Sequence, residues 1–181
     1  SISSAGIENW VRYIGSQGVN TERTVTGLLA SNQLHVLSNI DGNTSAVQNT
    51  DIRYSIYDIQ GNLLSETDYA TEMEETATRI FLHSGGAAFV TANTYQISAN
   101  DLDIKADIIV FSNGAGTLAY SRNTSDSIDF FATGQLVGNI LYTGGSSYTI
   151  NGKRDAFLGK YAVASPTPGC TDIAACNYNP S

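Results

Sequence analysis

The feature that most constrains this chain is a succession of short apolar runs in which apolar and polar residues alternate and which end at Gly, Asn or Asp. Alternation with a period of two puts apolar side chains on one face of an extended strand, whereas a helix needs apolar residues three and four apart. Helical spacing is almost absent from the sequence. The chain is therefore predicted to be all-β, with residues 7–163 in antiparallel strands and no helix beyond a single turn.

Two hairpins are the clearest local features. The first is predicted to join Asp51–Asp58 to Leu63–Tyr69, through a turn in which Gly61 supplies the positive φ that tight turns require. The second is predicted to join Thr76–His83 to Ala87–Thr94 through a Ser-Gly-Gly turn. These segments supply the pattern against which the rest of the chain can be compared.

The same order of strands recurs along the chain. Strands that open with Asp51, Asp107 and Asp155 lie about 50 residues apart, a spacing suited to one four-stranded unit per repeat. In the second unit, Gly114–Gly116 is predicted to form the turn. We expect antiparallel four-stranded repeat units that begin near Asp51 and Asp107, three of which are visible.

On these segments the chain resembles a bacterial β-propeller repeat family, whose units carry an Asp-Ala-Phe-Val strand, a Gly-Asn turn, a Trp-containing strand and a Gly-rich hairpin. The resemblance rests on residues 155–160, 61–64, 9–10, 13–18 and 139–144. It implies β-propeller-like packing of the units. Because a propeller usually needs at least four blades, three units are expected to belong to a larger ring, to share a ring with a second chain, or to close in another compact arrangement.

The repeat phase predicts how the first and last units are related. The N-terminal unit contains the Trp10 strand without the strand that should precede it, and the C-terminal segment 155–161 is a first strand without its followers. Pairing the two would satisfy edge amides and carbonyls that are otherwise exposed. We expect this pairing to occur within one chain, or between chains if the ring is an oligomer.

A domain boundary is predicted after residue 164, where Ser-Pro-Thr-Pro at 165–168 forms a stiff linker between a β domain, 1–164, and a tail, 169–181. The tail resembles the opening of a cysteine-containing extracellular repeat of large secreted or surface proteins of Bacteroidetes. That resemblance implies a modular protein at the cell surface or outside the cell. It also makes Cys170 and Cys176 disulfide candidates whose pairing stays open.

Charge and motifs exclude several functions. The formal net charge is −8 with 9 Lys and Arg residues, so no basic stripe exists for nucleic acid, and no apolar stretch is long enough for membrane insertion. Nucleotide-binding and Gly-x-Ser-x-Gly motifs are absent. The two histidines, His35 and His83, lie in apolar runs and are expected to be structural. The chain is therefore expected not to be an enzyme.

Acidic residues offer a weak metal site. Asp101, Asp103 and Asp107 alternate and could present oxygen ligands to Ca²⁺, but the Gly and the terminal Glu of an EF-hand loop are missing and Lys105 intrudes. No cofactor is expected, with Ca²⁺ at these aspartates as the alternative to a solvated connection. The acids within 72–75 are likewise predicted to form a charged loop.

Aromatic residues offer the other candidate site. Among one Trp and ten Tyr residues, Trp10 and Tyr13 are the most plausible pair for stacking on a sugar. The sequence therefore favours a non-enzymatic structural or adhesive repeat module, whose partners are other domains of the same protein or other surface proteins. The alternative is a carbohydrate-binding module attached to a secreted enzyme, which would bind glycans.

Overall fold

The computed structural model describes residues 22–42, 49–98, 101–123, 127–149 and 152–163, and these ranges contain eleven antiparallel strands and no helix. The prediction of an all-β chain is confirmed for these ranges. The strands are β1 (Glu22–Ala30), β2 (Gln33–Gly42), β3 (Asn49–Asp58), β4 (Leu63–Tyr69), β5 (Glu74–Leu82), β6 (Ala88–Ser98), β7 (Asp101–Ser112), β8 (Ala115–Arg122), β9 (Ser127–Val137), β10 (Ile140–Thr149) and β11 (Arg154–Ala162).

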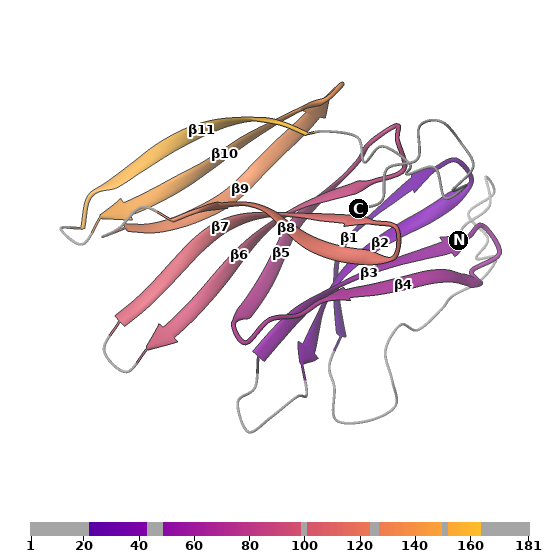
Figure 1. Cartoon of the computed structure of the whole chain (residues 1–181), viewed down its shortest axis with the longest axis horizontal. Coiled ribbons are helices and arrows are strands. Elements are labelled where there is room, and N and C mark those ends of the chain that lie inside the picture. The colour runs from indigo at the N-terminus through magenta and orange to yellow at the C-terminus, as the bar shows by residue number, and fades with distance from the viewer. Residues whose placement is uncertain (1–21, 43–48, 99–100, 124–126, 150–151, 164–181) are drawn as a thin grey trace, which may run out of the picture.

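The strands form three sheets in which neighbours in sequence are neighbours in space (Figure 1). Sheet 1 has the order β1-β2-β3-β4, sheet 2 the order β5-β6-β7-β8, and sheet 3 the order β11-β10-β9. Both predicted hairpins are present, as β3–β4 and β5–β6. Gly61 has the positive φ expected of it, 86°. Local alternation and turn residues therefore identify these hairpins correctly.

Two tight turns depend on left-handed backbone. The β1–β2 turn has positive φ at both Ser31 and Asn32, and the β7–β8 turn at both Asn113 and Gly114. Positive φ at both central residues defines the turn that matches the twist of a two-stranded hairpin. The turn predicted at Gly114–Gly116 is thus one residue out of place, because Ala115 already pairs with Ser112 in the ladder.

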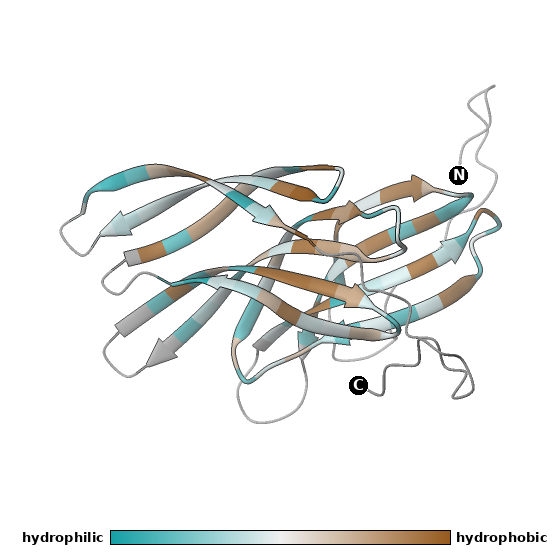
Figure 2. Cartoon of the chain, turned by 45° about the horizontal axis from the view of Figure 1, so that its top comes forward, coloured by the Kyte–Doolittle hydropathy of each residue, from teal (hydrophilic) through white to brown (hydrophobic). Residues whose placement is uncertain are grey.

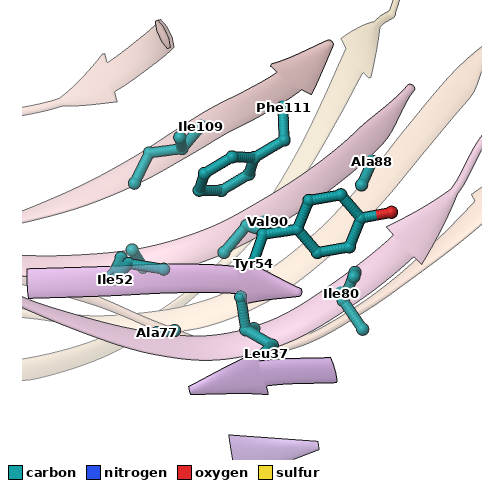
Figure 3. Close-up of a cluster of buried hydrophobic side chains, with 10 residues drawn as sticks. Leu37, Ile52, Tyr54, Ala77, Ile80, Ala88, Val90, Ile109 and Phe111 are labelled. Atoms are coloured by element: carbon teal, nitrogen blue, oxygen red, sulfur yellow. The ribbon is translucent and has the colours of Figure 1, made fainter. Parts of the chain in front are cut away.

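Sheet 2 lies in the middle, with sheet 1 packed on one face and sheet 3 on the other (Figures 1 and 2). Successive side chains of a strand point to opposite faces, so β6 sends Val90 toward sheet 1 and Phe89 toward sheet 3. Burial on both faces explains why Ala88, Phe89 and Val90 at the start of β6 are consecutive apolar residues. The core between sheets 1 and 2 contains the side chains drawn in Figure 3, among them Leu37, Ile52, Tyr54, Ala77, Ile80, Ala88, Val90, Ile109 and Phe111.

The units do not begin where the sequence suggested. Sheets begin with β1, β5 and β9, and Asp51, Asp107 and Asp155 lie in the third strands, β3, β7 and β11. A repeating pattern does not show which strand is the first of each unit. The strongest hairpin signal comes from the third and fourth strands, so the sequence pattern places the start of the units there. The coarse prediction of stacked antiparallel repeat units is confirmed, with four, four and three strands in the described residues.

The expected pairing of the first and last units stays a prediction. Among the described strands, β11 pairs with β10, with Lys160 opposite Tyr142. The predicted partner strand around Trp10 lies outside the described residues. The linker at 165–168 and the tail at 169–181, with Cys170 and Cys176, also lie outside them.

Candidate functional site

The first strand of each sheet starts with a buried acid. The side chain of Glu22 is 4% exposed, and Glu75 and Asp129 are 0% exposed. Three residues after each acid the strand contains one extra residue, a β-bulge, which changes the direction of the neighbouring side chains. The extra residues are Val25, Thr78 and Ala132. The three acids therefore occupy equivalent positions in the three sheets.

An asparagine links each sheet to the next. Asn39 Oδ1 in sheet 1 accepts a hydrogen bond of 2.9 Å from the Ala77 amide in sheet 2, and Asn93 Oδ1 in sheet 2 accepts one of 2.9 Å from the Phe131 amide in sheet 3. Each amide lies two residues after a buried acid and next to the bulge. The asparagines satisfy buried donors that the interrupted ladder does not. Two junctions, sheet 1–sheet 2 and sheet 2–sheet 3, thus share one plan.

The second junction holds its acid against a cation. Asp129 Oδ1 lies 3.4 Å from Nε of Arg122, at the end of β8. The Arg122 guanidinium also lies over the Phe157 ring, 4.6 Å from its centre, in a cation–π contact. A buried carboxylate is tolerated where an opposite charge compensates its lost hydration. Asp129 is provided with such a partner.

The first junction places a tyrosine where the second has this arginine. Tyr69 ends β4 opposite Ile52, just as Arg122 ends β8 opposite Ala106. The Glu75 carboxylate accepts a hydrogen bond from the Thr71 hydroxyl. The equivalent position therefore supplies no cation to Glu75.

Carboxyl groups instead surround Glu75. The Asp51 carboxyl is within hydrogen-bonding reach of Glu75, and Asp107 is close enough to interact with it through its charge. Asp107 is itself buried and accepts a hydrogen bond of 2.6 Å from the Thr94 hydroxyl. All three acids are nearly or fully buried. We call Asp51, Glu75 and Asp107 the acidic cluster.

Burial shifts the ionisation of this cluster. Burial, together with the charges of Asp51 and Asp107, raises the pKa of Glu75 to about 7 against the opposing effect of the Thr71 hydrogen bonds. Burial, followed by the charge of Asp68, raises the pKa of Asp51. Burial together with the nearby acids raises the pKa of Tyr69 to about 12. Each shift disfavours the negatively charged form.

The expected loop at 72–75 is wrong for its last two residues, since Glu74 and Glu75 lie in β5 and Glu75 is fully buried. The alternation of apolar and polar residues in 74–82 is interrupted at Thr78, the extra residue of the bulge. Because of this interruption, the pattern of the later residues does not indicate that Glu75 points inward. The signal that could have found it is the recurrence of an acid at Glu22, Glu75 and Asp129, each close to the start of a strand.

Of the three aspartates proposed for Ca²⁺, Asp101, Asp103 and Asp107, the last two have different hydrogen-bond partners. The segment is strand β7 rather than a solvated connection, and the Asp101 backbone pairs with Ser98. Asp103 accepts a hydrogen bond of 3.2 Å from the Asn123 side chain, whereas Asp107 lies in the acidic cluster. In the described ranges no group of three His, Cys, Asp or Glu side chains is arranged to hold a metal ion.

Both histidines are packed against partners. His35 Nδ1 lies 2.6 Å from the Tyr54 hydroxyl, and burial lowers the pKa of the His35 imidazole. His83 Nδ1 accepts a hydrogen bond from the Gly85 amide at 3.0 Å, so its protonated Nε2 donates to Asn139 Oδ1 at 2.8 Å. His83 therefore connects a turn of sheet 2 to a turn of sheet 3.

The proposed sugar-stacking pair, Trp10 and Tyr13, lies outside the described residues. Comparison with known proteins adds no family assignment, because no protein-family model and no curated protein sequence matches the chain. Within the described ranges, no helix has the length and apolar character needed to span a bilayer.

Proposed function

We propose that this chain is a non-enzymatic structural or adhesive module of a larger secreted or cell-surface protein, built from four-stranded sheets that stack in a propeller-like order. The resemblance of the tail to an extracellular repeat supports the location. The observation that carries the proposal is the outer face of sheet 3. Its exposed residues correspond to residues of sheets 1 and 2 that the next sheet buries.

Equivalent residues allow the three sheets to be compared. The residue that follows each buried acid pairs with Asn39 in sheet 1, Asn93 in sheet 2 and Ser146 in sheet 3. Counting along the third strands from these pairs makes Leu158 the counterpart of Tyr54 and Ile108. Tyr54 is 6% exposed and Ile108 1% exposed, because each is covered by the next sheet, whereas Leu158 is 93% exposed.

Other residues on this face fit the same interpretation. Tyr142 is exposed, although its counterpart in sheet 2, Phe89, is buried against sheet 3. Lys160 and Arg154 are exposed on the same face, and Arg154 lies 5.0 Å from the ring centre of Tyr148. Because first strands of this chain begin with an acid, two cations on the receiving face favour a further sheet of the same kind.

Self-association tests the proposal, since an uncovered face should recruit a sheet from another copy at high concentration. Leu158→Lys should reduce concentration-dependent association measured by sedimentation velocity. Leu64→Lys, on exposed β4 and away from this face, is the matched control. Both variants should leave the free energy of unfolding within about 0.5 kcal/mol. Association that is equally strong in both variants would contradict the proposed role of this face.

A further inference from the structure

The acidic cluster contains buried oxygens without donors. Oε2 of Glu75 and Oδ1 of Asp107 are buried and have no hydrogen-bond partner among the described residues. Leaving a buried oxygen unsatisfied costs about 1–3 kcal/mol, and more when the group is charged. Such an arrangement calls for a positive charge, a metal ion or a proton.

The chemistry of the Glu75–Asp51 pair favours a proton over a positively charged side chain or a metal ion. Two ionised carboxylates are acceptors only and cannot hydrogen-bond to each other, whereas a protonated carboxyl can donate to its neighbour. Two carboxyl groups that share a site hold one proton between them, because both cannot ionise at close range. One shared proton therefore fits a fully buried Glu75 with an unsatisfied Oε2 that lies close to the buried Asp51 carboxyl.

We propose that the junction between sheets 1 and 2 is a proton-held latch, in which Glu75 and Asp51 share one proton and the contact between the sheets weakens when that proton is lost. The latch joins β5 of sheet 2 to the start of β3 in sheet 1. In the second junction the Arg122 cation takes the role that the proton has in the first.

Among the described residues, the groups that face Glu75 in the latch do not supply another cation. Asp107 faces Glu75 from β7, and Tyr69 faces it from β4. Within the described ranges, no Lys or Arg nitrogen lies within ion-pair distance of Glu75 or Asp107.

Two cations nearby in sequence are already engaged. Asp68 faces Asp51 from β4, and its carboxylate is bound by both Nε and Nη2 of Arg53. Lys105, two residues before Asp107, lies 3.9 Å from an Asp103 oxygen and donates a hydrogen bond to Gln96. Among the described residues, a proton is therefore the neutralising species that Glu75 can acquire.

The sign of the pH dependence follows from Glu75. Its pKa rises from 4.5 to about 7 on folding, so the folded chain binds the extra proton more tightly than the unfolded chain. The resulting stability is fully present below pH 4.5 and is lost as the pH rises through about 7. One linked proton changes the unfolding equilibrium constant by up to about tenfold per pH unit within that window.

Chemical denaturation of the full chain from about pH 4.5 to about pH 8 tests the latch. The wild-type unfolding constant should increase with pH across the window. Glu75→Gln should remove this increase, because the amide of glutamine donates to Asp51 without needing a proton. Asp129→Asn is the matched control at the second junction and should retain the increase. Asp51→Asn provides the same test as Glu75→Gln if the latter fails to fold.

A direct measurement of the Glu75 carboxyl by carbon-detected NMR should show a midpoint near 7 in the folded chain. A midpoint near the ordinary value of 4.5 would overturn the proposal. So would a Glu75→Gln variant that keeps the wild-type pH slope. If added Ca²⁺ alone stabilises the wild type at alkaline pH and Glu75→Gln abolishes that effect, the cluster binds a metal ion and the shared proton is wrong.

Discussion

The two junctions between sheets have the same backbone plan but neutralise their buried acids differently. Both contain an asparagine bond to the following sheet and an acid followed by a bulge. The second junction meets its acid, Asp129, with Arg122. The first surrounds its acid, Glu75, with other carboxyl groups. The comparison teaches that the repeat fixes the position of a buried acid without fixing what balances its charge.

One position at which the two junctions differ lies at the end of the fourth strand. The last residue of the fourth strand is Tyr69 in sheet 1 and Arg122 in sheet 2, at equivalent places in the ladder. A cation there places an opposite charge beside the buried Asp129, with part of the guanidinium buried as well. A tyrosine there leaves Glu75 to gain a proton instead. Exchanging residues between the junctions should therefore exchange their properties.

The largest effect is expected at the apolar centre of the second junction. Phe131 occupies the position that Ala77 has in the first, and it packs on Phe157 and Tyr161. Phe131→Ala removes this ring from a buried site and should lower the free energy of unfolding by about 3–5 kcal/mol. Urea denaturation measures the loss. A loss under about 1 kcal/mol would show that the junctions do not depend on this packing.

The next effect concerns charge. Arg122→Tyr gives the second junction the residue of the first and leaves Asp129 buried without its cation. Because Arg122 is partly exposed, the expected loss is about 1–3 kcal/mol at alkaline pH. A loss under about 0.5 kcal/mol would show that Arg122 does not compensate the buried charge of Asp129 and would contradict the comparison.

The asparagine bonds should matter equally in both junctions. Asn39→Ala and Asn93→Ala each leave a buried backbone amide without its acceptor. Each substitution should cost about 1–2 kcal/mol. Amide hydrogen exchange at Ala77 and Phe131, respectively, should accelerate as the local bond is lost. If only one of the two substitutions lowers the free energy of unfolding, the two asparagine bonds have the same geometry but do not stabilise the junctions equally.

Sequence reasoning identified the strands better than the sheets. Alternation and Gly61 located the β3–β4 hairpin, because both are local properties of a strand and its turn. The boundaries of the sheets depend on which strands pair with which neighbours, and Asp51 and Asp107 misled because each opens a prominent run inside a sheet. The burial of Glu75 was missed for a related reason, since the bulge at Thr78 interrupts alternation.

The smallest effect is expected from the reverse exchange. Tyr69→Arg places a guanidinium at the first junction, where it should face Glu75 and Asp107 as Arg122 faces Asp129. Lost tyrosine packing opposes the gained ion pair, so the net change in unfolding free energy should stay below about 1 kcal/mol. The pH slope should change more clearly. A nearby cation favours ionised Glu75, lowers its pKa, and reduces the number of protons released on unfolding.

Tyr69→Met is the control for this exchange, because it changes the packing of the same side chain without adding charge. It should retain the wild-type decrease in stability between pH 4.5 and about 7, while Tyr69→Arg flattens it. If the two variants share one slope, the residue at the end of the fourth strand does not decide how the buried acid is neutralised. The difference between the junctions would then have to come from Asp51, which brings a carboxyl group to Glu75.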